Sequence, residues 1–232
     1  MAKAREDYLT RIGSNLNFTE GVEIPEADVI LALDSAVDWY SNDRAREKLY
    51  PITGDGTNRY ALPTDWEKGF SVIIHVEFPA GTSATKDPSL LDQEEVRVWE
   101  DNNGEKIQFL FRTLATTDTA WLRYTLRHTL SDSTNSVPDS DFDALCYLAI
   151  AIASLTIAGR LLKHKSQAGV SGGIINLRTT SDEYKSYAQE MLKHYYRRMG
   201  IPPEQGKPAA MDVFDLDPLP AWGFPWLTHR NR

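Results

Sequence analysis

The sequence is poor in the residues on which covalent cross-links and thiolate metal clusters depend. Its 232 residues include a single cysteine, Cys146. One cysteine cannot form an intrachain disulfide or a cysteine-based metal cluster. Because Cys146 lies within an apolar stretch, we expect it to be a buried small hydrophobic residue and not a reactive thiol.

Positive charge is also scarce. The chain has 25 Lys and Arg against 33 Asp and Glu, which gives a formal charge of −8 and a pI of about 5.2. Affinity for nucleic acid depends on clustered Lys and Arg, so this balance argues against bulk attraction to phosphate. Residues 1–14 carry charges and no apolar core, unlike a signal peptide. We therefore expect a soluble chain made in the cytoplasm.

No catalytic or metal-binding pattern is present in the sequence. The five histidines show no HxH or HExxH spacing and are interpreted as solvated or locally paired; they are His75, His128, His164, His194 and His229. The stretch 54–58 lacks a calcium-loop pattern and is predicted to be a turn. The glycine-rich stretch 169–173 has no GK[ST] after it, so it is not a phosphate loop. There is no GxSxG.

One strand carries three polar side chains that could bind an acid, namely Arg123, Arg127 and His128. A solvent-facing sheet surface explains them equally well. We therefore predict that the chain is not an enzyme and has no cofactor and no metal.

A long apolar helix organises the rest of the chain. It is predicted over residues 142–169, and the sixteen residues Ala144–Gly159 contain no charge. Ser140 is the expected N-cap, with Asp143 three positions on, and Gly169 is the expected end. An ordinary surface helix has one charged face, whereas this helix has none for about four turns. Other protein segments or lipid must therefore cover this helix on every side.

Three kinds of neighbour could cover this helix. A bilayer needs about 20 apolar residues, and the run is too short and too rich in alanine to favour one. The helix is then either the centre of a single-chain core or is covered partly by its own chain and partly by other copies, and periodicity does not separate the two. The residues expected to make these core or oligomer contacts are Leu148, Ile152, Leu155 and Ala158.

Helical spacing recurs in three other stretches. A short helix is predicted over 2–12, a longer one over 27–49 with Pro25 near its start, and a third from Ser181 as N-cap to Gly200. The link 170–180 is glycine-rich and then β-like. The acidic and basic residues of the second helix indicate a solvated face.

Residues 50–137 show short alternating runs instead. Strands are predicted over 70–78, with Val72, Ile74, Val76 and Phe78 on one face, and over 95–100, 106–111 and 121–130. The Asn-Gly pair before residue 105 indicates a hairpin. Four strands in series predict an antiparallel sheet with one solvent-exposed face. Residues 80–94 form the longest predicted loop.

The last 32 residues hold six of the twelve prolines and two of the six tryptophans. Proline forbids a long helix, and a disordered tail should be poor in aromatics. The segment either folds back on its own domain or is an arm that docks on another chain by strand addition and aromatic anchors, and the second is favoured. The expected arm contacts are Phe214, Leu216, Leu219, Trp222, Phe224, Trp226, Leu227, His229 and Arg230.

These stretches together predict an α+β fold. It is a small bundle of long helices with an inserted antiparallel β region and an extended C-terminal arm. The expected divisions are 1–49 for the N-terminal helices, 50–137 for the β insertion, 138–200 for the central and C-terminal helices and 201–232 for the arm.

The order of these parts resembles the head-to-tail adaptor, or head-completion, proteins of tailed bacteriophages. The local sequences that carry the resemblance are LPTDW at 62–66, HVEFP at 75–79, YLA at 147–149, AGR at 158–160, YYRRMG at 195–200 and the aromatic tail with His229-Arg230. The resemblance covers most of residues 25–232.

The resemblance implies a structural role in the virion neck, for a protein made in the host cytoplasm. Such proteins form a ring, commonly of twelve copies, that joins the capsid portal to the tail and extends the DNA channel. The implied partners are the portal protein, tail or neck proteins and copies of the chain itself, with no membrane. Double-stranded DNA would pass without specific binding, because a negative channel wall repels phosphate. The alternatives are another neck component, of the tail-completion or stopper type, and, more remotely, a cytoplasmic enzyme with an unrecognised site or a generic cytoplasmic binding module.

Overall fold

The computed structural model describes residues 3–16, 25–81, 89–102, 104–165 and 173–202. The helices are α1 (Arg5–Leu16), α2 (Glu26–Asp43), α3 (Phe142–Lys165) and α4 (Gly173–Met199), with short 3-10 turns η1 (Gln93–Glu95) and η2 (Asp139–Asp141). The strands are β1 (Arg46–Thr53), β2 (Arg59–Ala61), β3 (Ile73–Glu77), β4 (Val96–Asp101), β5 (Gly104–Phe109) and β6 (Thr119–Leu126). The predicted α+β class is confirmed.

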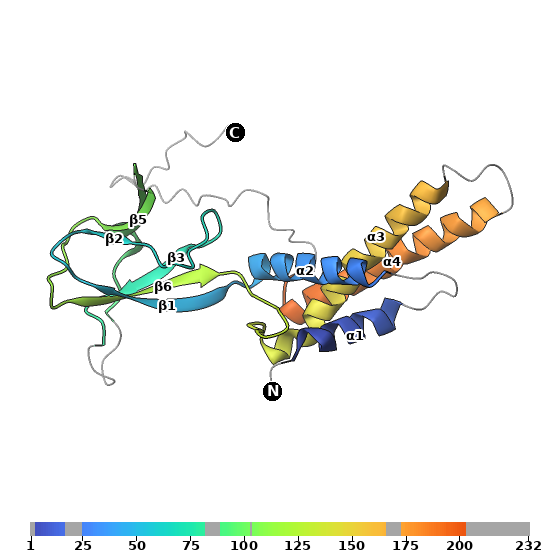
Figure 1. The fold of residues 1–232 in the computed structure, drawn as a ribbon, viewed down its shortest axis with the longest axis horizontal. Helices are drawn as coiled ribbons and strands as arrows, with labels where there is room; N and C mark the ends of the chain where they lie inside the picture. The colour runs from blue at the N-terminus through green and yellow to red at the C-terminus, as the bar shows by residue number, and fades with distance from the viewer. Residues whose placement is uncertain (1–2, 17–24, 82–88, 103, 166–172, 203–232) are drawn as a thin grey trace, which may run out of the picture.

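The helices and the strands occupy opposite ends of an elongated molecule (Figure 1). The chain passes from α2 into β1 and returns from β6 to α3. Each end has its own hydrophobic core. The β region is therefore an insertion between α2 and α3, as the change of periodicity predicts.

Helix α3 is the central element of the helical end. Helices α1, α2 and α4 all pack on it. Its buried residues include Leu145, Leu148, Ala149 and Ala151. Helix α4 runs antiparallel to α3, because the Ser181 hydroxyl donates to the carbonyl oxygen of Ala158 while Arg198 pairs with Asp143 at the other end. The predicted central helix is thus buried mainly by its own chain.

The aspartates of α2 tie it to four other parts of the chain, and Asp34 and Asp38 also lie exposed on the predicted solvated face. Each carboxylate accepts a hydrogen bond from a different part of the chain. The four pairs are Asp28 with Arg160 of α3, Asp34 with Arg5 of α1, Asp38 with Arg127 after β6, and Asp43 with Tyr195 of α4. Helix α2 is therefore fixed at both ends and along its length.

The β region consists of two antiparallel three-stranded sheets, in the orders β1-β6-β3 and β2-β5-β4. They share one core, to which Leu122 and Tyr124 contribute from the first sheet and Ile107 and Phe109 from the second. At Gly54 an added Cβ would lie 2.0 Å from the Ala115 carbonyl oxygen, so only glycine lets the chain pass from β1 towards β2 here.

The predicted helix boundaries need four corrections. The helix expected over 2–12 runs from Arg5 to Leu16. The helix expected over 27–49 ends at Asp43, and Arg46–Thr53 is strand β1. Helix α4 begins at Gly173, so the residues after it are helical and not β-like, and Ser181 bonds to α3 instead of capping a helix. Ser140 lies in η2, where its hydroxyl donates to Asp141. The expected end at Gly169 lies outside the described residues.

The strand predictions were correct in position but not in arrangement. The hairpin is confirmed, with Asp101 paired to Gly104. The four expected strands belong to two sheets, and β1 and β2 were not predicted. Val72 was expected on the apolar face of its strand but is exposed, because the register shifts between Ile73 and His75 and breaks the alternation.

Candidate interaction surfaces

The C-terminal half of α3 keeps an apolar stripe on its outer side. Ile152, Leu155, Gly159 and Leu162 follow one another at spacings of three or four, so they lie along one line of the helix. Leu155 is 48% exposed and Leu162 39%, while Ile152 is half-buried. We refer to these four residues as the α3 stripe.

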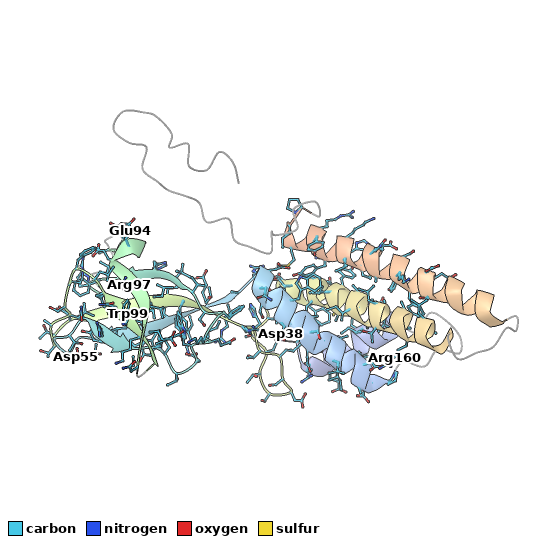
Figure 2. The ribbon with its side chains drawn as sticks, turned by 90° about the horizontal axis from the view of Figure 1, so that it is seen from above. Asp38, Asp55, Glu94, Arg97, Trp99 and Arg160 are labelled. Atoms are coloured by element: carbon cyan, nitrogen blue, oxygen red, sulfur yellow. The ribbon has the colours of Figure 1, made fainter. Side chains whose placement is uncertain are left out.

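The α3 stripe is exposed to solvent because helix α1 covers only the first half of α3. Helix α1 packs near the beginning of α3, where the rings of Tyr8 and Phe142 lie 4.6 Å apart. Among the side chains that the structure describes, the charge beside the stripe is Arg160, which lies near the end of α3 in Figure 2 and is paired with Asp28. Lys163 follows the stripe in the last turn of α3. An exposed apolar line from Ile152 to Leu162 is a surface suited to another apolar helix or chain.

The structure divides the four predicted helix residues into two kinds. Leu148 and Ala158 are buried in the chain's own core. Ile152 and Leu155 lie on the stripe, where a neighbour could reach them. The nine predicted arm residues, from Phe214 to Arg230, lie outside the described residues.

Polar contacts join the helical end to the β region. Arg127, just after β6, pairs with Asp38 of α2 and with Glu67 before β3, both at 3.0 Å. Asp38 lies at the end of the helices that faces the β region (Figure 2). The backbone N–H of His128 donates to the hydroxyl of Ser41, at 2.9 Å. The two ends are therefore held by side chains as well as by the connecting chain.

The basic side chains that were considered as an acid-binding set bind the chain's own groups. Arg123 pairs with Glu47 at 3.2 Å, and Arg127 pairs as described above. His128 is buried, and its Nδ1 lies 3.0 Å from the Ser136 carbonyl oxygen, which can only accept a hydrogen bond. Burial and the nearby Arg46 and Arg44 lower the pKa of His128, so the ring is neutral.

Cys146 is buried, as predicted. Burial raises the pKa of its thiol to about 12, which removes its nucleophilic form at neutral pH. Within the described ranges, no group of three or more His, Cys, Asp or Glu side chains could hold a metal ion.

A groove of about 460 Å³ opens in the β region between the two sheets. Its walls come from β3 and β4, each an edge strand of its own sheet, and from the chain beside them. Apolar side chains dominate the lining, and they include Trp66, Ile73, Val76, Leu91, Val96 and Val98. We refer to it as the β3–β4 groove. The sequence analysis missed it because it assumed one sheet, whose two faces leave no such opening.

Part of one wall of this groove is formed by Trp66 of the LPTDW sequence. The carboxylate of Asp65 accepts hydrogen bonds from the Tyr124 hydroxyl and from Lys48, both at 2.5 Å. Partial burial alone would raise its pKa, but these two bonds keep the pKa of Asp65 below its ordinary value. Trp66 then lies against Tyr124, with ring centroids 5.8 Å apart.

By length and composition, one helix of the described part, Asp139–Leu162, could cross a membrane. Within its most apolar window, 56% is buried inside the chain. The central helix of a folded core passes the same test, so this finding does not favour a membrane span.

Comparison with known proteins gives only distant structural matches. No protein-family model matches the chain, and no curated protein matches its sequence. Among solved structures it is similar to a chain in the neck of an empty gene transfer agent (GTA) particle, with 13% identity and a TM-score of 0.27, covering 80% of this chain and 93% of that one.

Two other matches come from the same kind of particle. One is a chain in the virion of a native GTA particle, with 13% identity and a TM-score of 0.26 over 80% of this chain and 93% of that one. The other is a chain in the neck of a native GTA particle, with 14% identity and a TM-score of 0.27 over 80% and 92%. Similarity at this level establishes neither a shared fold nor a shared role.

Proposed function

We propose that the chain is a structural protein of the neck of a phage-like particle. Its copies form a ring, commonly of twelve, that joins the capsid portal to the tail and extends the DNA channel. The observation that carries the proposal is the α3 stripe, because a contiguous apolar line exposed on the central helix is the kind of surface that marks a protein–protein contact.

The burial pattern of α3 supports self-association over a single-chain role. The helix has its own partners on three sides, so the stripe is the part left for a neighbouring copy. Complete burial of a leucine side chain is worth about 1.5–3 kcal/mol, and Leu155 and Leu162, at 48% and 39% exposure, would each gain roughly half of that at an interface. Repeated around a closed ring, such contacts add to a stable assembly without any one of them being strong.

The charge of the chain fits a channel. A formal charge of −8 per copy gives a ring a negative field that repels phosphate. DNA then passes without being held, as packaging and ejection require.

In this arrangement each segment has one role. The helices of 1–49 and 138–200 pack around the ring, the β insertion of 50–137 faces the tail side or the outside, and the arm of 201–232 reaches the portal or a neighbour. The sequence resemblance to head-to-tail adaptors supports this assignment. The GTA matches name the same kind of assembly, but the proposal does not depend on them.

Deleting residues 218–232 from the full chain tests the portal contact. Mixed with isolated portal rings and sedimented, the full chain should travel with the portal, and the shortened chain should stay behind while keeping its circular dichroism spectrum. Retained attachment of the shortened chain would refute the arm. Failure of the full chain to attach at all would refute the neck role.

A further inference from the structure

The β3–β4 groove is bordered by two strand edges that lack strand partners in the described part of the chain. Among the described residues strand β4 pairs only with β5, so no described strand lies along the other edge of Arg97–Glu100. Strand β3 pairs with β6, and in the part of the chain that the structure describes its outer edge carries the short bridge between Glu77 and Leu90. Such edges are templates for a further strand.

We propose that residues 212–219 of the C-terminal segment add to the β4 edge as an extra strand and fill the β3–β4 groove. This places the receptor for the arm's first half within the protein itself. The residues from Trp222 onward remain available for an outside partner.

The side-chain pattern of the groove fits an added strand. By the alternation of a strand, Val96 and Val98 project to the face of β4 that carries the shared core, whereas Arg97 and Trp99 project to the opposite face. Arg97 also borders the groove. Val98 is still 36% exposed, so the apolar floor of the groove is incomplete. An incoming strand with apolar residues at every second position would complete it.

Residues 212–219, DVFDLDPL, have that pattern. In an extended strand Phe214 and Leu216 point to one side, and Asp215 and Asp217 to the other. Pro218 has no N–H to donate, so strand pairing ends there. The segment therefore has the length and alternation of one short edge strand.

The charges on β4 and on residues 212–219 also favour this segment as the added strand. Arg97 has only neutral partners in the described structure: its guanidinium lies 3.3 Å from the Gln108 amide oxygen and 4.7 Å from the Trp99 ring centroid. Figure 2 places Arg97 and Trp99 close together on the β region. With Phe214 and Leu216 facing the groove, Asp215 and Asp217 lie on the side of the sheet where Arg97 lies.

The arm leaves the helical end at a suitable place. Near the end of α4, Tyr195 donates to Asp43 at 2.7 Å, and Asp43 is the last residue of α2, just before β1. The described chain ends at Pro202, and the nine residues 203–211 span up to about 30 Å when extended. Strand β1 has 8 residues and is about 26 Å long, so this linker can cover the β region.

Cysteine cross-linking in the full chain tests the proposal. Val98→Cys combined with Leu216→Cys is oxidised under mild conditions, and Trp99→Cys with Leu216→Cys is the matched control on the opposite side of β4. The native Cys146 is buried, so we expect it to form no disulfide in this experiment. We expect at least about ten-fold more disulfide for the Val98 pair, and its mobility on a non-reducing gel tells whether the arm belongs to the same copy or to a neighbour. Equal yields, or none, would overturn the proposal.

Hydrogen exchange gives a second readout that needs no new cysteine. In the full chain, replacing Phe214 and Leu216 by serine should speed amide exchange at Val98–Glu100 by about ten-fold and leave α2 and α3 unchanged. Unchanged exchange on β4 would contradict strand addition. Neither experiment requires a ring or a portal, so failure here is distinct from failure of the neck role.

Discussion

The Tyr40 hydroxyl donates a 2.5 Å hydrogen bond to Oδ2 of Asp141, across 101 positions of sequence. The same oxygen accepts from Arg44 at 2.7 Å, and the Ser140 hydroxyl donates to the other oxygen. Asp141 is buried, with only 11% of its side chain exposed. The contact closes the helical core where the chain enters and leaves the β region.

Asp141→Ala should therefore lower the free energy of unfolding by about 2–3 kcal/mol, because it leaves the buried Tyr40 hydroxyl without its acceptor. Asp143→Ala is the matched control two residues on. It removes an exposed pair with Arg198 and should cost less than about 1 kcal/mol. Denaturant unfolding measures both, and equal losses would show that the Tyr40 contact contributes no more than a surface pair.

Ala151→Glu should prevent folding or reduce stability severely. Ala151 is fully buried in α3, and a carboxylate there has no partner, which costs on the order of several kcal/mol. Thr156→Glu adds the same charge at an exposed position of the same helix and should shift the melting temperature by only a few degrees. A soluble Ala151→Glu protein with a normal melting curve would show that this face of α3 is open to water.

His128 should make stability depend on pH below about 6.5. Its pKa is lower in the folded protein than in the unfolded chain, chiefly through burial. As pH falls through 6.5 the unfolded chain takes up the proton first, so the free energy of unfolding decreases, by at most about 1.4 kcal/mol per pH unit. Above pH 7 the contribution is constant.

His128→Asn is the comparison, because its amide can still donate to the Ser136 carbonyl. The free energy of unfolding of each protein is measured between pH 7.5 and 5. In the difference between the two profiles, the contribution of the carboxylates that both proteins share cancels. The difference should fall with decreasing pH, and parallel profiles would rule out His128 as the titrating group.

The central helix and the change to β periodicity were predictable from sequence because they rest on composition over many residues. The position at which α2 ends could not be predicted from the sequence. The stretch up to Leu49 keeps helical spacing, and only the extended backbone of Arg44 shows that the helix has stopped. Strand β1 contains Pro51, which occurs in strands mainly at edges, and β1 is an edge strand.

The two candidate surfaces were harder to predict. Residues Ala144–Gly159 of α3 contain no charge, so sequence alone cannot distinguish buried Leu148 from exposed Leu155. That difference arises because α1 covers one half of the helix and leaves the other half bare. The β3–β4 groove depends on which strands are outermost, and pairing between distant strands is set by tertiary packing and not by local pattern.

The most direct test of the proposed ring is particle imaging of the full chain with isolated portal rings, beside Leu155→Glu and the control Gln189→Glu on an exposed face of α4. The wild type and the control should form closed rings on the portal axis. Leu155→Glu, folded by circular dichroism, should remain a 26.2 kDa monomer. Rings of normal symmetry from Leu155→Glu, or monomers from the wild type in the presence of portal, would contradict the account.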